Sequence, residues 1–179
     1  FSSAKLEADL TAIESLYHQR GFVAARAEAG FEQVGPAVPP PPQMQMLVRI
    51  TIREGVRTIV GSVRLQGNVS VPEATLRRTL TLQPGQPFFP PQIALDRDAL
   101  QLQYANLGYQ NATIDTSPGL SADGTRADIV FAVREGPRIF VHHVLIVGNV
   151  RTRTDTIERE LQIKPGDVLG LQAVSESQR

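Results

Sequence analysis

The stretch "YANLGYQNATI" stands at residues 104–114, and a looser copy, "YHQRGFVAARA", stands at residues 17–27. Each copy has a tyrosine, three further residues, a glycine and an aromatic residue, and the two glycines are 87 positions apart. Glycine is typical where a chain leaves a helix with positive φ, because it has no Cβ to clash. We interpret both copies as one junction, in which the tyrosine packs the end of a helix and the glycine turns the chain into a strand.

Other motifs repeat with a shorter offset of 81 residues, which suggests that a small domain is copied in tandem. They are the pairs Glu54-Gly55 and Glu135-Gly136, Gly67-Asn68 and Gly148-Asn149, and Pro84-Gly85 and Pro165-Gly166. The extra six residues of the first offset fall in "VGPAVPPPPQM" (34–44), where a surface loop absorbs an insertion at little cost. The prolines at 39–42 allow two interpretations, this loop insertion or a polyproline ligand.

One full copy predicts five elements in the order β-α-α-β-β. The alternating stretch at 57–67 predicts a strand, and the spacing of Ser70 and Glu73 is that of a capping box at the start of a helix. This first helix should run past Leu76 and Leu80 to Pro84-Gly85. The remaining elements are a helix from about Gln92 to Asn106 and a hairpin of two strands at 109–116 and 127–136.

The predicted fold class is therefore α+β, with tandem units that each hold a three-stranded mixed sheet covered on one face by two helices. The register divides the chain into the back of one unit (1–55), a complete unit (56–136) and the front of a third (137–179). We expect the chain to be excised from a longer protein. Because the first piece lacks the elements that the last piece supplies, neighbouring molecules are expected to complement each other head to tail.

This order of elements, with "GN" after the first strand, "L.L.PG" after the first helix, the "Y...GY" junction and "EG" before the next unit, resembles POTRA (polypeptide-transport-associated) domains. Such domains stand in tandem before the barrel of outer-membrane assembly factors of the BamA/TamA type. The resemblance implies a place at the periplasmic face of the outer membrane of a Gram-negative bacterium. It also implies three partners: nascent outer-membrane proteins in extended form, accessory lipoproteins, and a downstream barrel in the parent protein.

Composition and motifs argue against several other functions. Lysine plus arginine equals aspartate plus glutamate at 18 each, and nucleic-acid binding needs excess positive charge. The chain has no cysteine, no phosphate-binding loop and no nucleophile motif, so we expect no catalytic residue and no cofactor. Asp96 and Asp98 are interpreted as part of a solvated helix face. No metal site is expected, because His142 and His143 should point to opposite faces of a strand.

A surface must then carry the function, and an edge strand is the candidate, because its unpaired amides and carbonyls can accept another strand. The hairpin strands at 109–116 and 22–31 are the candidate edges. The predicted peptide-binding segment is formed by Asn111, Ala112, Thr113, Ile114, Asp115 and Thr116. Ile114 is expected to anchor this strand toward the helices. A proline at Thr113 or Asp115 is expected to remove an amide from the edge.

Two other functions within the binding class stay open from the sequence. One is the POTRA unit of a secretion transporter that exports a dedicated partner, and the other is a cell-division scaffold, which usually carries a single unit. An enzyme is disfavoured, since it would need a pocket in which polar groups converge.

Overall fold

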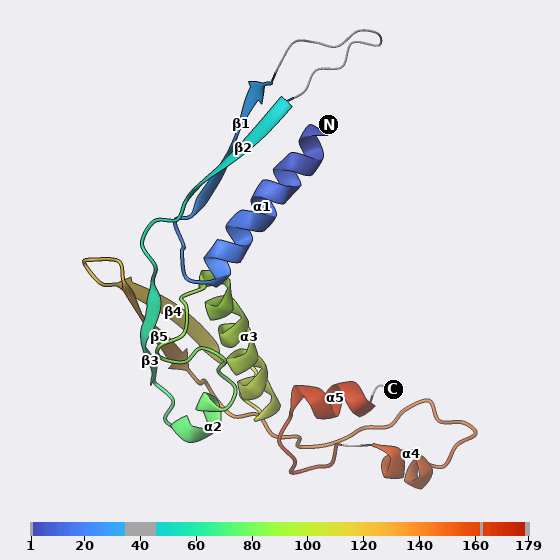
Figure 1. The fold of residues 1–179 in the computed structure, drawn as a ribbon. Coiled ribbons are helices and arrows are strands. Elements are labelled where there is room, and N and C mark those ends of the chain that lie inside the picture. The colour runs from blue at the N-terminus through green and yellow to red at the C-terminus, as the bar shows by residue number, and fades with distance from the viewer. Residues whose placement is uncertain (1, 35–45, 162, 178–179) are drawn as a thin grey trace, which may run out of the picture. The chain divides into compact units, whose positions relative to one another are not determined.

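The computed structural model describes residues 2–34, 46–161 and 163–177 (Figure 1). The proline-rich stretch at 39–42 lies outside these residues. The helices and strands, in chain order, are α1 (Ser3–Gln19), β1 (Arg26–Gln33), β2 (Met46–Arg53), β3 (Ile59–Gln66), α2 (Glu73–Arg77), α3 (Pro90–Asn106), β4 (Thr113–Leu120), β5 (Arg126–Arg134), α4 (Thr154–Glu160) and α5 (Leu171–Ser177).

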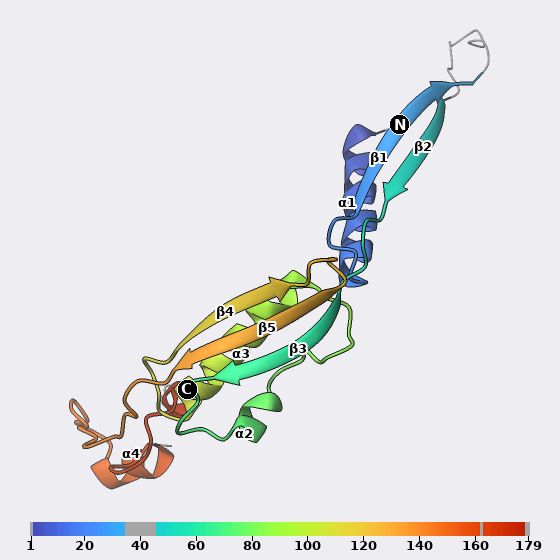
Figure 2. The ribbon, with the colours of Figure 1, turned by 90° about the vertical axis from the view of Figure 1, so that its left-hand side faces the viewer.

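The central part of the chain forms a three-stranded sheet in the order β3-β5-β4. Figure 2 shows β3 and β5 running in the same direction and β4 in the opposite one, so the sheet is mixed. The predicted α+β fold with a three-stranded mixed sheet is thereby confirmed. A second, two-stranded sheet pairs β1 with β2 in antiparallel register, from Arg26 opposite Arg53 to Gln33 opposite Met46.

The chain folds as two compact units. One comprises Phe1–Gly61, Pro84–Pro90 and Gly119–Asp128, and the other comprises Ser62–Gln83, Pro91–Pro118 and Ile129–Arg179. The repeat boundaries after residues 55 and 136 do not coincide with this division and stay a prediction.

The second unit holds the largest apolar core among the described residues. The inner face of β5 contributes Ile129, Phe131 and Val133, whose side chains are at most 5% exposed. One face of α3 contributes Ile93, Leu100 and Tyr104, while Leu95 and Leu102 of the same helix are 60% and 52% exposed. The helix therefore buries a single stripe against the sheet, as an amphipathic helix does.

The predicted capping box is wrong. Helix α2 begins only after Pro72, and no side chain caps its first amides. The backbone amide of Ser70 donates instead to both carboxylate oxygens of Glu135 (3.0 and 2.9 Å), and the amide of Val71 donates to the same carboxylate (3.2 Å). The carboxylate of Glu135, just after β5, thus accepts the backbone amides of this turn. The local pattern predicts that the side chains of Ser70 and Glu73 would cap these amides instead. The third copy has the same spacing at Thr152 and Asp155, and there too no side chain caps the helix, because the residue before α4 is Arg153.

Asp96 is also not part of a solvated face, since only 1% of it is exposed. Its carboxylate accepts the backbone amides of Thr81 (3.0 Å) and Leu82 (2.8 Å) and the hydroxyl of Thr81 (2.6 Å). These bonds fix the segment that follows α2. The helix itself is shorter than predicted, because it ends at Arg77. Asp98 fits the interpretation better, because it is exposed and pairs with Arg97 (2.7 Å).

The repeated junction is the same structure in both copies. The amide of Tyr109 donates to the carbonyl of Tyr104 (2.9 Å), and the amide of Phe22 donates to the carbonyl of Tyr17 (3.0 Å), which is the bond of a Schellman helix end. The glycines between them have φ of 90° at Gly108 and 93° at Gly21, as predicted. In each copy the two aromatic rings meet edge to face with centroids 5.7 Å apart.

The tyrosine of the junction and the glutamate of the "EG" motif are hydrogen-bond partners, a contact that is not among the sequence predictions. The hydroxyl of Tyr104 donates to Glu135 (3.1 Å). In the first copy, a hydrogen bond to Glu54 raises the pKa of Tyr17. Both members of the pair recur in the sequence, and their joint recurrence was the signal that could have revealed the contact.

The junction also binds the segment that follows the "EG" motif. The carbonyl of Gly21 accepts the amide of Thr58 (2.8 Å), and the carbonyl of Gly108 accepts the amide of Ile139 (2.9 Å). One residue earlier, Arg57 donates to the carbonyl of Arg20 (3.2 Å) and Arg138 donates to that of Leu107 (3.0 Å). The two glycines therefore lie at contact points as well as at turns.

The strand expected at the start of the third copy is not formed within the described residues. Residues 141–147 form neither a helix nor a strand, and the bridge found among the described residues of this region joins Phe140 to Val168. A strand is defined by its hydrogen-bonded neighbour, and no described strand lies beside this segment. Leu145 and Val147 are accordingly 85% and 78% exposed.

Candidate functional site

The candidate site is the outer edge of β4. This strand lies at the margin of the sheet, with β5 as its only neighbour in the strand order. Across the described ranges, no backbone hydrogen bond reaches the outer side of β4. Figure 2 shows β4 along one border of the sheet, with α3 behind the sheet and not beside the strand.

The structure places the six predicted site residues in two settings. Asn111 and Ala112 lie in the turn before the strand, and Ala112 is buried (3% exposed). Thr113 to Thr116 form the first half of β4. Ile114 is 6% exposed, so it anchors the strand on the helix side, as predicted. Thr113 and Asp115 face solvent on the opposite side, where Asp115 pairs with Arg134 of β5 (2.9 Å).

The hairpin register decides which amides of β4 point outward. The amide of Ser121 donates to the carbonyl of Arg126 (2.9 Å), so this residue faces β5. In an antiparallel ladder the direction of N–H and C=O alternates from one residue to the next. The amides of Thr113 and Asp115 therefore point into the sheet, and those of Ile114 and Thr116 point away from it. The expectation that a proline at Thr113 or Asp115 would act on the edge is wrong, because it would break the ladder to β5.

The other margin of this sheet is partly covered. The amide of Val60 in β3 donates to the carbonyl of Gln86, its carbonyl accepts the amide of Gly85, and both bonds are 2.8 Å long. A bridge between Ile59 and Pro87 continues this cover. An incoming strand would have to displace these bonds, so β3 is the poorer acceptor.

The other predicted edge, at 22–31, is occupied where it begins. Strand β1 starts at Arg26, and the amide of Ala27 donates to the carboxylate of Glu14 (2.9 Å). Ala27 lies at the position of Ile114 in the repeat, whereas Glu14 corresponds to Gln101, which is exposed. The carboxylate that caps this amide in the first copy thus has no counterpart in the central copy.

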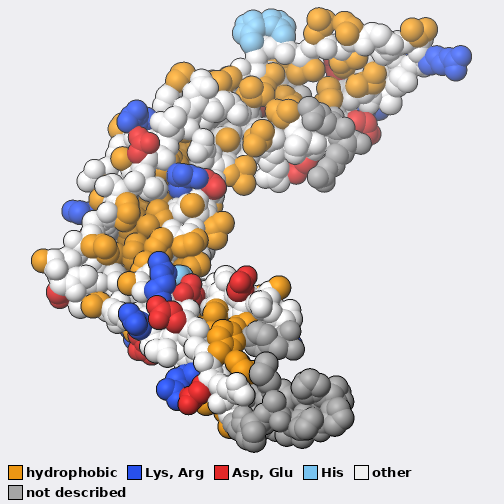
Figure 3. All heavy atoms as spheres, turned by 90° about the horizontal axis from the view of Figure 1, so that it is seen from above, with side chains coloured by type: hydrophobic (Ala, Val, Ile, Leu, Met, Phe, Trp, Pro, Cys, Tyr) orange, Lys and Arg blue, Asp and Glu red, His pale blue; other side chains and the backbone are white. Residues whose placement is uncertain are grey.

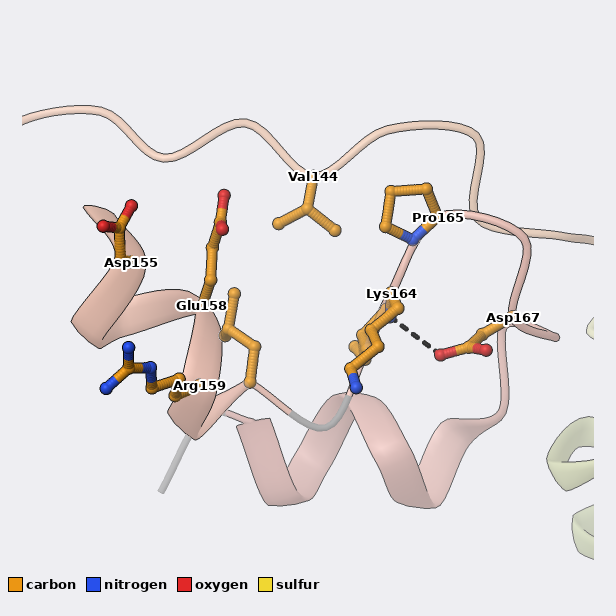
Figure 4. A pocket seen from close by; sticks show the side chains of 9 residues that line it. Val144, Asp155, Glu158, Arg159, Lys164, Pro165 and Asp167 are labelled. Atoms are coloured by element: carbon orange, nitrogen blue, oxygen red, sulfur yellow. Dashed lines mark hydrogen bonds between the residues drawn. The ribbon is translucent and has the colours of Figure 1, made fainter.

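A hollow in the C-terminal part is lined by both apolar and charged side chains (Figure 4). Val144 points into it from the segment before Gly148, and Glu158 and Arg159 on α4 and Lys164 also line it. Its apolar lining includes Val144, Leu161 and Ile163, which correspond to Val63, Leu80 and Leu82 of the central copy. In the central copy those residues are buried in the apolar core (4%, 8% and 4% exposed). The hollow therefore corresponds to part of that core and not to a catalytic pocket.

The two adjacent histidines were predicted to point apart, and this is wrong. The rings of His142 and His143 lie with centroids 4.2 Å apart and their Nδ1 atoms in contact, because the segment is not a regular strand. Two nitrogens alone do not make a metal site, and the described residues contain no group of three or more His, Cys, Asp or Glu side chains suited to an ion.

No helix in the described part is long and apolar enough to cross a bilayer.

The structure thus defines a class of protein, a β-α-α-β-β module formed by β3, α2, α3, β4 and β5. A family model described as POTRA, surface antigen variable number repeat, matches residues 58–136 and 139–179. The chain belongs to the POTRA family.

Curated relatives agree with this family. The chain is 27% identical over 163 residues to the outer membrane protein assembly factor BamA of Neisseria meningitidis serogroup B, a match that covers 90% of this chain and 20% of the relative. It is 26% identical over 170 residues to the BamA of Nitratidesulfovibrio vulgaris, covering 91% of this chain and 20% of that protein. The chain therefore spans about a fifth of the length of these relatives.

Solved structures show the same fold. The crystal structure of Haemophilus influenzae BamA POTRA3-5 superimposes with a TM-score of 0.56 at 24% identity, covering 99% of this chain and 68% of the other. BamA from Haemophilus ducreyi lacking POTRA domains 1-3 gives a TM-score of 0.50 at 20% identity, covering 75% of this chain and 24% of that one.

Proposed function

We propose that this chain is the periplasmic POTRA region of an outer-membrane protein assembly factor, and that β4 receives extended segments of client proteins by strand addition. The relatives named as assembly factors support the first part. The outward amides of Ile114 and Thr116, on a strand margin that nothing in the described part of the chain pairs with, carry the second part.

The chemistry of the edge suits clients that have different sequences. Main-chain hydrogen bonds give affinity that depends little on the side chains of the incoming strand. Barrel proteins consist of strands with alternating polar and apolar residues, and such strands are unpaired before the barrel closes. Accessory lipoproteins and a barrel in the parent protein belong to the same proposal and would use other surfaces of the chain.

Strand β4 is already ordered before a partner binds. Ile114 is buried and fixes the strand, and Asp115 bridges to Arg134 on the neighbouring strand. Little ordering of β4 is then needed on binding, and the entropy cost falls on the peptide. Because a few main-chain bonds barely exceed that cost, we expect weak and rapidly reversible binding, which suits the transfer of clients.

Thr116→Pro should weaken strand addition by about tenfold, because it removes one of the two outward amides without touching the ladder to β5. The measurement is an NMR titration of the labelled chain with a peptide of about ten residues that alternates like a barrel strand. For the wild type we expect shifts at Ile114 and Thr116. The matched control is Thr116→Val, which keeps the amide and the shape of the side chain and should bind as the wild type does. Wild-type shifts confined to other surfaces, or full binding by a folded Thr116→Pro variant, would refute the edge model.

Binding of a neutral peptide should depend little on salt. The formal net charge is zero, and Figure 3 shows acidic and basic side chains interspersed on the face drawn, with no field of one sign. Without such a field there is no long-range attraction for ions to screen, so the dissociation constant should change less than about twofold between about 50 and 500 mM NaCl. A steep loss of affinity with salt would show that charged side chains, and not the backbone of β4, provide the contact.

A further inference from the structure

One residue of β4 interrupts its outer edge. The alternation that turns the amides of Ile114 and Thr116 outward gives the same direction to the backbone at Pro118, and proline has no amide hydrogen. The open edge therefore offers donors at Ile114 and Thr116, a gap at Pro118, and a further amide only at Leu120. An incoming strand that follows the ladder loses its next hydrogen bond at this gap.

Packing does not require this proline. Its side chain is exposed, so it fills no space in the core. Strand β1 is the counterpart of β4 at an offset of 87 residues, has the same length and has Phe31 at the corresponding position. The fold thus forms this strand with an ordinary amide at the position. Proline within a sheet is confined to margins such as this one, where it blunts the edge against further strands.

We propose that Pro118 sets the length and register of the strand that β4 accepts. This inference rests on the proposed function of the same edge. A client would pair with the segment from Ala112 to Thr116 and leave the sheet before Pro118. The favoured ligand is a short extended segment whose hydrogen-bonding groups meet Ile114 and Thr116, and a full barrel strand would be held over only part of its length. Short pairing keeps the bound strand exchangeable.

The experiment compares the full chain with its Pro118→Thr variant, which restores an amide with a residue that favours strands. A fluorescent ten-residue alternating peptide is titrated by anisotropy, and the contact is mapped by NMR. We expect about three- to tenfold tighter binding by Pro118→Thr, the gain of about one further hydrogen bond, with shifts extending to Leu120. Ser117→Thr is the matched control, because its amide faces β5 and adds no outward donor, so its affinity should equal that of the wild type.

Each other outcome is informative. Equal affinity of wild type and Pro118→Thr, with wild-type shifts on β4, would overturn the role of Pro118 and leave the proposed function standing. Absence of peptide binding to both proteins would overturn the proposed function and this inference together. Self-association of Pro118→Thr through β4, detected by sedimentation, would support the role of Pro118 as a stop for added strands. It would also show that β4 of a second copy of the chain can compete with the client strand.

Discussion

Glu135→Gln should lower the free energy of unfolding by about 2–3 kcal/mol at neutral pH, since a buried network that centres on a charged acceptor loses that acceptor. Glu135 is 9% exposed, and its carboxylate accepts the amides of Ser70 and Val71 and the hydroxyl of Tyr104. Glutamine keeps the shape, but it has one acceptor oxygen, and its amide group would face these donors. The measurement is urea unfolding of the full chain followed by circular dichroism.

The pH dependence of this difference follows from the pKa of Glu135. Burial raises that pKa, while the hydrogen bonds from Ser70, Tyr104 and Val71 lower it, and the net shift is downward from the ordinary value of 4.5. A carboxyl group with a lowered pKa in the folded state stabilises the fold above its ordinary pKa, and this stabilisation is lost as the pH falls through the folded value. The gap between wild type and Glu135→Gln should therefore be full at neutral pH and shrink below about pH 4.5.

Two variants serve as controls for this prediction. Tyr104→Phe removes one of the bonds to Glu135 and should cost about 1 kcal/mol. Glu54→Gln changes the matching residue of the first copy, which is exposed, and should have a much smaller effect. A Glu135→Gln variant with wild-type stability at neutral pH, or a gap that does not change with pH, would contradict the assigned role of the carboxylate.

Much of the fold could be predicted because the repeat supplies two samples of one pattern. The second helix, the hairpin and the positive φ of Gly108 followed from periodicity and from glycine placement. The errors share a physical cause. Ser70 with Glu73 is a local cap pattern, but Glu135, 65 residues away from Ser70, supplies the acceptor. Likewise, the spacing of Asp96 and Asp98 on one helix predicts a solvated face, but Asp96 is buried and accepts the backbone amides of Thr81 and Leu82. Local patterns do not reveal an acceptor that comes from a distant part of the chain.

The candidate site shows the same division. That a hairpin strand would lie at an edge followed from the order of elements, and the burial of Ile114 followed from alternation. The direction of the amides did not, because it depends on the hairpin register, which the bond from Ser121 to Arg126 fixes. Sequence alone could not tell that Thr113 and Asp115 face β5. Pro118 was visible in the sequence, but its meaning required that register.

The repeated junction explains why its glycines cannot be exchanged for residues with a side chain. A Cβ at Gly108 would lie 2.3 Å from Cγ1 of Val168 and 3.1 Å from the carbonyl oxygen of Ile139. At Gly21 it would lie 2.4 Å from the carbonyl oxygen of Thr58. Positive φ is therefore one of two constraints. The second is the close approach of other parts of the chain, which are Val168 and Ile139 at Gly108 and Thr58 at Gly21. The two constraints can be separated by experiment.

Gly108→Ala should destabilise the chain by about 3 kcal/mol, of which about 1–2 kcal/mol is left-handed strain and the remainder is overpacking. Gly85→Ala is the matched control, because Gly85 has nearly the same φ (87° against 90°) and its added Cβ would meet no atom within 4 Å. The difference between the two variants in urea unfolding isolates the contact. Val168→Ala should recover part of the loss when combined with Gly108→Ala, giving a favourable coupling in a double-mutant cycle. Equal destabilisation by Gly108→Ala and Gly85→Ala, with no coupling to Val168, would show that backbone strain alone selects glycine at this junction.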